Sequence, residues 1–135
     1  MHLSVIIPAY NEGKRITGTL ISIRDYLSKQ SYDWEVLVVS DGSTDNTVEV
    51  VRNFALENQG FKAIDNKENH GKGYVVRQGM LEAKGDYRLF TDADNSTTID
   101  HIEKFWPYFN QGYDVVIASI AAKGATMAHS EKFYK

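Results

Sequence analysis

The chain has 135 residues, of which 42% are hydrophobic and 24% charged, with a formal net charge of −3 at pH 7. These values indicate one globular domain with a hydrophobic core, and they argue against a nucleic-acid partner, which would usually meet a basic face. The absence of cysteine excludes disulfides and thiolate metal sites. No apolar run approaches the roughly 18 residues of a membrane-spanning helix, and the N-terminus lacks a signal-peptide pattern, so we expect a cytoplasmic protein.

Strands and helices are predicted to alternate along the chain. Short apolar, β-branched runs predict strands at 3–7, 35–40, 61–65, 87–91 and 113–119. Apolar residues at helical spacing predict a helix after each of the first four strands. The residues that define these four helix faces are Ile16, Leu20, Ile23 and Leu27; Val48, Val51 and Ala55; Val75, Val76, Met80 and Ala83; and Ile99, Ile102 and Trp106.

Polar and small residues predict where these helices begin and end. Ser43 or Thr44 is expected to cap the second helix, because a hydroxyl can accept from its first free N–H groups. Gly85 stands where the third helix needs a C-cap, and Pro107 is expected to break the fourth.

The resulting order, βαβαβαβαβ, predicts an α/β fold with a mostly parallel sheet and helices on both faces. Right-handed crossovers then place the carboxyl ends of all strands at one edge, where ligands bind in open α/β sheets. Four unusual loops follow the strands: "PAYNEG" at 8–13, "SDGSTD" at 40–45, "NKENHGKG" at 66–73 and "TDADNS" at 91–96. Their shared edge favours a binding site over ordinary polar loops.

Asp92 and Asp94 form a D-x-D pair directly after the fourth strand. Two such carboxylates can converge on one hard cation, Mg²⁺ or Mn²⁺, which would bridge to substrate phosphates. The alternative is a surface turn with a side-chain hydrogen bond, which Asp and Asn also favour.

The segment "NHGKG" at 69–73 has the composition of an anion-binding loop. Gly71 and Gly73 flank Lys72 just before a helix, where backbone N–H groups and a lysine attract phosphate. The alternative is a glycine-permitted turn with a solvated lysine. Arg77, one turn into that helix, either faces the same edge or faces solvent.

The first two loops supply groups for a nucleoside. Tyr10 offers a flat surface on which a nucleobase can stack, and Glu12 offers an acceptor. Asp41, at the tip of the second strand, either accepts from a base N–H or caps the following helix.

Four co-linear motifs, "SVIIPAYNE", "VVSDGSTDNT", "NHGKGYVVRQG" and "DADNST", resemble the nucleotide-binding half of glycosyltransferase family 2. Within that family the chain is most similar to the dolichyl- and polyprenyl-phosphate glucosyl and mannosyl synthases. The resemblance covers about residues 2–119. It implies a Rossmann-like GT-A fold, inverting chemistry, a nucleoside diphosphate sugar donor and Mg²⁺ or Mn²⁺.

The resemblance also implies roles by position. Asp92 and Asp94 would be the metal ligands and the catalytic carboxylates that hold the diphosphate. Asp41 would contact the base. The residues implied to bind the donor are Pro8, Ala9, Tyr10, Glu12, Asp41, Gly71, Lys72, Gly73, Arg77, Asp92 and Ala93.

The sequence departs from the family pattern at two positions. Ser40 stands where the family often has the first Asp of Asp-Asp-Gly-Ser, and Ile120 stands where an Arg is expected after the fifth strand. The resemblance also implies that the domain runs on for about another hundred residues, with the acceptor site, beyond this sequence. We therefore expect a C-terminally truncated fold, with a partial nucleotide-sugar-binding domain at 1–119, an irregular or divergent tail at 120–135, and a missing C-terminal half or partner chain.

The expected reaction is inverting transfer of a hexose from a UDP-glucose- or GDP-mannose-type donor to a polyprenyl or dolichyl phosphate. Such a lipid-phosphate acceptor implies work at the cytoplasmic face of a membrane, in cell-envelope glycan synthesis or protein glycosylation. One alternative is a truncated, nucleotide-binding remnant without activity. Another is a flavodoxin-like signalling domain, which fits the strand–helix alternation but leaves the four loop motifs unexplained.

Overall fold

The computed structural model describes residues 1–118 and 128–131 of the chain. The chain divides into two compact units, Met1–Thr98 and Ile99–Lys135, and each is described by itself. Among the described residues, none of the helices combines the length and the apolar character that crossing a membrane requires.

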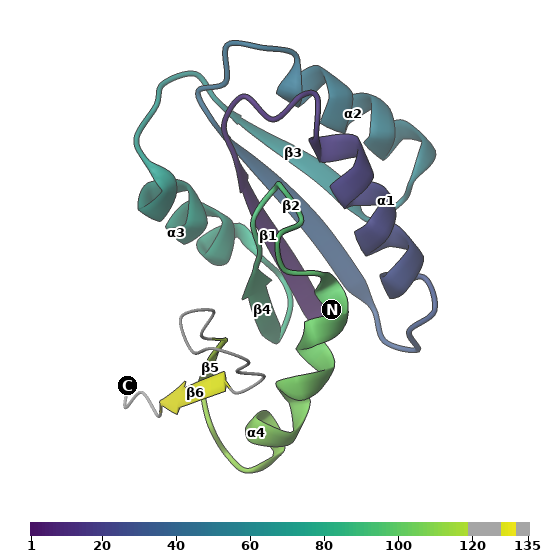
Figure 1. Ribbon diagram of the computed structural model, residues 1–135, viewed down its shortest axis with the longest axis vertical. Coiled ribbons are helices and arrows are strands. Elements are labelled where there is room, and N and C mark those ends of the chain that lie inside the picture. The colour runs from purple at the N-terminus through teal and green to yellow at the C-terminus, as the bar shows by residue number, and fades with distance from the viewer. Residues whose placement is uncertain (119–127, 132–135) are drawn as a thin grey trace. The chain divides into compact units, whose positions relative to one another are not determined.

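The first unit is a four-stranded parallel sheet in the order β3-β2-β1-β4, and a helix follows each of the first three strands along the chain (Figure 1). This confirms the predicted parallel sheet and the first three predicted helices. The elements are β1 Leu3–Ala9, α1 Ile16–Leu27, β2 Trp34–Asp41, α2 Thr47–Glu57, β3 Phe61–Asn66, α3 Lys72–Glu82 and β4 Tyr87–Phe90.

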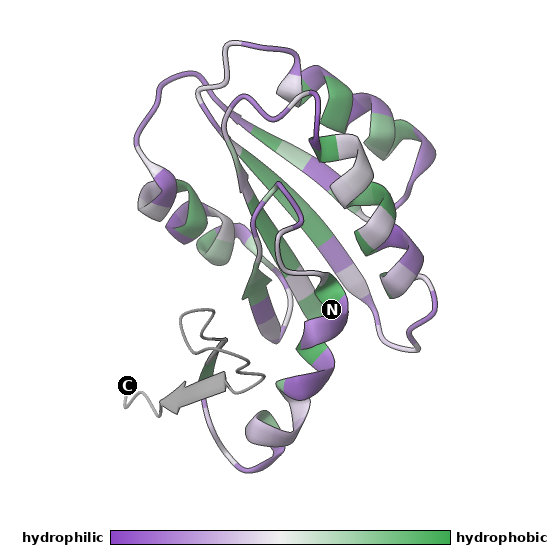
Figure 2. Cartoon of the chain, in the orientation of Figure 1, coloured by the Kyte–Doolittle hydropathy of each residue, from purple (hydrophilic) through white to green (hydrophobic). Residues whose placement is uncertain are grey.

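Helix α3 covers one face of the sheet. Successive side chains of a strand point to opposite faces, and the register pairs Ile6 of β1 with Leu37 of β2. Both residues pack with Val75 and Ala83 of the α3 segment in one buried cluster. The strands β1 and β2 are strongly hydrophobic, whereas the loops at their carboxyl ends are hydrophilic (Figure 2).

Helices α1 and α2 lie together on the opposite face (Figure 1). The alternate residues of β1 and β2, such as Val5 and Val36, point toward this face and are fully buried. The predicted apolar face of α1 is buried as well, from Ile16 to Leu27. Helices on both faces are thereby confirmed, and both core strands are held between two apolar layers.

Two predictions about helix ends are wrong. Helix α2 begins at Thr47, and Asp45 rather than Ser43 or Thr44 accepts from its free N–H, with 3.0 Å between Thr47 N and Asp45 Oδ1. The Ser43 hydroxyl instead accepts the N–H of Asn11 at 3.1 Å, so it joins the second loop to the first.

Gly85 does not cap α3, which ends at Glu82 with Ala83 in an extended conformation. It lies where the chain passes β1: a Cβ at Gly85 would be 2.6 Å from the backbone nitrogen of Ser4. Gly85 N also donates to Ser4 Oγ at 2.8 Å. The glycine therefore permits close approach of two backbone segments.

Gly85→Ala is expected to destabilise the fold by about 1–3 kcal/mol, because the new methyl group meets backbone that cannot rotate away. Urea unfolding monitored by circular dichroism would measure the loss. Gly18→Ala is the matched control: a Cβ there meets nothing within 4 Å, so it should leave stability unchanged or raise it by up to about 1 kcal/mol through helix propensity. Equal stability of the two variants would contradict the packing role.

The second unit contains a 3₁₀ helix η1 at Ile99–Lys104, α4 at Trp106–Asn110, β5 at Val115–Ala118 and β6 at Ala128–Glu131. Pro107 stands in the first turn of α4 rather than breaking a helix, since its missing N–H is not needed there.

The fifth predicted strand exists as β5, but its pairing differs from the expected continuation of the parallel sheet. It pairs antiparallel with β6 in a separate two-stranded sheet. Most of the predicted tail, including Ile120, lies outside the described residues. The described part of the tail is the strand β6. The division of the chain at residue 119 stays a prediction.

Candidate functional site

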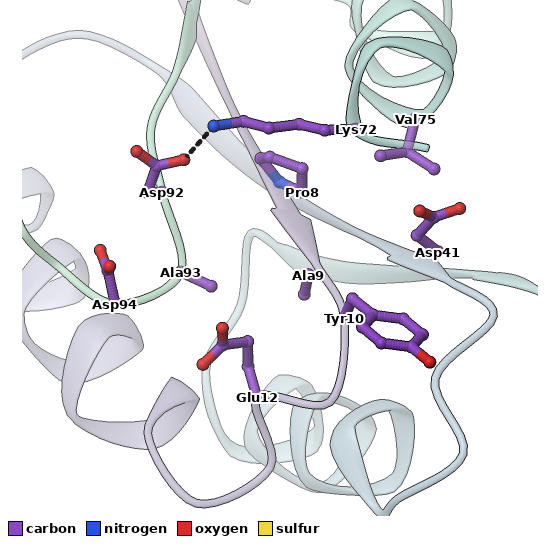
Figure 3. Close-up of a pocket in the computed structure, with 10 residues that line it drawn as sticks. All are labelled: Pro8, Ala9, Tyr10, Glu12, Asp41, Lys72, Val75, Asp92, Ala93 and Asp94. Atoms are coloured by element: carbon purple, nitrogen blue, oxygen red, sulfur yellow. Dashed lines mark hydrogen bonds and ion pairs between the residues drawn. The ribbon is translucent and has the colours of Figure 1, made fainter. Parts of the chain in front are cut away.

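A cavity of about 200 Å³ opens where the loops after β1, β2 and β4 meet the start of α3 (Figure 3). It lies within the first unit, at the carboxyl edge of the parallel sheet, as the topology predicts. The residues that line it are Pro8, Ala9, Tyr10, Glu12, Asp41, Lys72, Val75, Asp92, Ala93 and Asp94.

Most of the predicted site residues thus surround one space. Val75 was missed as a lining residue, because its apolar character fitted the helix core and gave no separate signal. Gly71, Gly73 and Arg77 do not line the cavity, and Arg77 is exposed on α3.

Asp92 and Asp94 lie on the loop that follows β4, at one side of the cavity, and Asp41 lies at the other (Figure 3). Ser96 N donates to Asp94 Oδ1 at 3.0 Å. Asp94 therefore also makes the side-chain hydrogen bond of a surface turn, which was the alternative to a metal ligand. The hydrogen bonds from Ser96 lower the pKa of the Asp94 carboxyl, and the positive charge of Arg15 lowers it further. The carboxylate is therefore kept ionised, as a metal ligand requires.

The D-x-D loop is anchored from α1. The Thr19 hydroxyl donates to the Ala93 carbonyl at 2.6 Å, and both residues are buried. This carbonyl lies between the two carboxylates in sequence, so the contact fixes the middle of the loop. Sequence reasoning missed Thr19, although a polar residue inside the apolar stripe of Ile16, Leu20 and Ile23 was the available signal.

Thr19→Val should weaken divalent-metal binding, because it keeps the side-chain shape but leaves the buried Ala93 carbonyl without its donor. A buried carbonyl without a donor costs about 1–3 kcal/mol. The D-x-D loop is expected to shift so that this carbonyl finds another donor. Thr19→Ser retains the hydroxyl and should bind metal like the wild type. Calorimetric titration with Mn²⁺ and UDP would measure both, and equal affinities in the two variants would refute the anchoring role.

Lys72, the first residue of α3, reaches across to Asp92 (Figure 3). The Lys72 Nζ lies 2.5 Å from Asp92 Oδ1 and 5.9 Å from the centroid of the Phe90 ring. The side chains of Lys72 and Asp92 are 59% and 48% exposed. The pair is thus accessible to solvent, and a bound anion or cation can separate it.

The loops after β1 and β2 are fastened to each other. Asn11 Oδ1 accepts from Thr44 N at 2.8 Å, Glu12 N donates to Thr47 Oγ1 at 2.9 Å, and Gly13 N donates to Asp45 Oδ2 at 3.1 Å. This network holds the backbone next to Tyr10, which stays 48% exposed. One wall of the cavity is therefore held by hydrogen bonds, and the Tyr10 ring on it is exposed.

The Glu12 carboxylate is not free in this wall. It accepts two hydrogen bonds of 2.7 Å from the Arg15 guanidinium, which raise the pKa of Arg15. Arg15 in turn contributes to the low pKa of Asp94. Sequence reasoning missed this arginine, whose place in the first loop gave no motif signal.

Within the part of the chain that the structure describes, no group of three or more acidic, histidine or cysteine side chains could hold a metal. Of the D-x-D loop, Asp92 and Asp94 line the cavity, so this loop would offer a metal at most two carboxylate ligands. Such a site suits Mg²⁺ or Mn²⁺, which keep several waters and are commonly completed by substrate phosphates. The residues present fit a metal that binds together with a phosphorylated ligand.

The sequence matches the family described as Glycosyl transferase family 2 over residues 4–133. One similar protein is the dolichyl-phosphate beta-glucosyltransferase ALG5C of Trichomonas vaginalis, 38% identical over 109 residues. The match covers 77% of this chain and 32% of that protein. The chain thus spans about a third of the length of this curated relative.

Two solved structures are similar to this one. S. aureus TarS 1-349, in complex with UDP-GlcNAc, matches with a TM-score of 0.66 and 30% identity, over 82% of this chain and 32% of that one. The mannosyltransferase PcManGT of Pyrobaculum calidifontis, in complex with GDP-Man and Mn²⁺, matches with a TM-score of 0.59 and 32% identity, over 69% and 27%. These matches confirm the predicted GT-A fold.

Proposed function

The chain belongs to glycosyl transferase family 2, and from this premise we propose that its cavity binds a nucleoside diphosphate sugar for hexose transfer. The observation that carries the proposal is the meeting of Tyr10, Lys72 and the D-x-D pair around a single cavity. An aromatic face, a cation and a pair of carboxylates are the groups that a base, a diphosphate and its metal need.

Each group has a separate task in this proposal. Tyr10 provides the surface on which the base stacks, and Pro8 and Ala9 form the floor beneath the nucleoside. Lys72 supplies positive charge beside the diphosphate. Asp92 and Asp94 hold Mg²⁺ or Mn²⁺, which would neutralise the charge that develops on the leaving diphosphate.

The acceptor that we propose is a polyprenyl or dolichyl phosphate. The similar Trichomonas vaginalis protein is named a dolichyl-phosphate beta-glucosyltransferase, which supports this class. An acceptor phosphate oxygen forms a bond to the anomeric carbon as the bond to the nucleoside diphosphate breaks, with inversion. Because a phosphate is ionised near neutral pH, no strong base is required. Such an acceptor implies action at the cytoplasmic face of a membrane.

Calorimetric titration with UDP and GDP, each with and without Mn²⁺, tests the donor site. Metal-dependent binding of one nucleotide is expected, and it would select between a UDP-glucose- and a GDP-mannose-type donor. A folded chain that binds neither nucleotide would overturn the proposal.

Transfer is tested separately, with the sugar nucleotide that the titration selects and a short-chain polyprenyl phosphate. Formation of the lipid-phosphate sugar would support the complete reaction in this chain. Nucleotide binding without transfer would favour the alternative of a nucleotide-binding remnant without catalytic activity.

A further inference from the structure

The carboxylate of Asp41 is engaged by the loop that follows β3. Asp41 ends β2 and is 6% exposed. Its Oδ1 accepts the N–H of His70 at 2.7 Å and that of Gly71 at 3.2 Å, and its Oδ2 accepts the N–H of Gly71 at 3.0 Å. Both oxygens of the carboxylate therefore bind backbone of this loop.

The same loop is fitted to the backbone at the tip of β2. Asn69 Nδ2 donates to the Asp41 carbonyl at 3.1 Å. Gly42 has φ of +71°, and a Cβ there would lie 2.7 Å from both Asn69 N and the carbonyl carbon of Glu68. A side chain at position 42 would therefore push the loop away, and the glycine permits the contact that Asp41 then secures.

The loop leads directly into the residue that crosses the cavity. Gly71 is the N-cap of α3, with φ of 98°, and Lys72 is the first helical residue. The N-cap residue is a glycine and has no side chain of its own to cap the helix, and its amide is held by the Asp41 carboxylate. The Lys72 ammonium, one residue on, reaches Asp92 at 2.5 Å.

From these contacts we propose that Asp41 is a positioning residue, which holds the start of α3 so that Lys72 faces the D-x-D pair. This role differs from the base contact that the family resemblance implies for Asp41. It rests on the proposed donor site, because the group that Lys72 serves there is the diphosphate. A base N–H has to compete with two backbone N–H groups for this carboxylate.

Asp41→Ala and Asp41→Asn separate the two roles. Asp41→Ala should weaken UDP and inorganic pyrophosphate, which carries no base, by the same factor, about 10-fold or more as for other orienting partners. Asp41→Asn should restore most of the loss, since the amide oxygen can take over the two contacts of Oδ1. Combining Asp41→Ala with Lys72→Ala should cost less than the sum of the single changes, as expected for residues that act together.

Weaker UDP binding with unchanged pyrophosphate binding, and additive effects of Asp41→Ala and Lys72→Ala, would overturn the proposal in favour of base contact. Hydrogen exchange of a peptide spanning 66–74 provides a readout without nucleotide. The His70 and Gly71 amides should exchange faster in Asp41→Ala and stay protected in Asp41→Asn. Unchanged exchange would refute the loop contact, whereas failure of the wild type to bind any nucleotide would refute the donor site alone.

Discussion

Asp94→Ala is expected to abolish the metal-dependent part of nucleotide binding. Asp94 is one of the two carboxylates of the D-x-D pair, and among the described residues no group of three or more acidic, histidine or cysteine side chains could hold a metal without it. Losing an orienting partner of a metal ligand costs about 10- to 100-fold in affinity, so losing a ligand itself should cost about 100-fold or more. Calorimetry with the preferred nucleotide, with and without Mn²⁺, measures the effect.

The fold should survive the Asp94→Ala change, because the side chain is exposed and accepts its hydrogen bond from Ser96, only two residues away. Asp25→Ala provides a matched control: this carboxylate is 59% exposed on α1 and pairs with the adjacent Arg24. The control should bind metal and nucleotide like the wild type. Undiminished Mn²⁺-dependent affinity in a folded Asp94→Ala protein would refute the metal role of the D-x-D pair.

The parallel sheet and the place of the candidate site could be predicted because each depends on local patterns. β1 is apolar at nearly every position, as expected for a strand covered on both faces. The connection rules then bring Tyr10, Asp41 and Asp92 to one edge although they lie far apart in the sequence. Neither step requires knowledge of individual side-chain contacts.

The contacts that fix the site could not be predicted in the same way. Thr19 and Ala93 are 74 residues apart, and nothing near Thr19 identifies its acceptor. Asp41 is similar: a carboxylate at a strand tip can cap the next helix, and here it binds a different loop instead. The antiparallel pairing of β5 could not be predicted either, since a short apolar strand has the same composition in parallel and antiparallel sheets.

Lys72→Ala is expected to change the affinities for metal and for nucleotide in opposite directions. In the free protein the Lys72 ammonium forms an ion pair with Asp92, where its positive charge repels an incoming cation. Removing it should tighten binding of Mn²⁺ alone, by about fivefold at most, since exposed ion pairs are weak. The same change removes a cation from the diphosphate, and losing a charge-assisted hydrogen bond should weaken UDP or GDP by about 10-fold or more.

Lys67→Ala is the matched control, because Lys67 also pairs with an aspartate, Asp65 at 2.7 Å, but does not line the cavity. It should alter neither affinity. Titration with Mn²⁺ alone and then with nucleotide at saturating Mn²⁺ measures both effects in each variant. The opposite signs are the decisive feature, because a general loss of structure in Lys72→Ala would weaken binding of both ligands together. Parallel losses would therefore refute the expectation that Lys72 leaves Asp92 and pairs with the diphosphate when the donor binds.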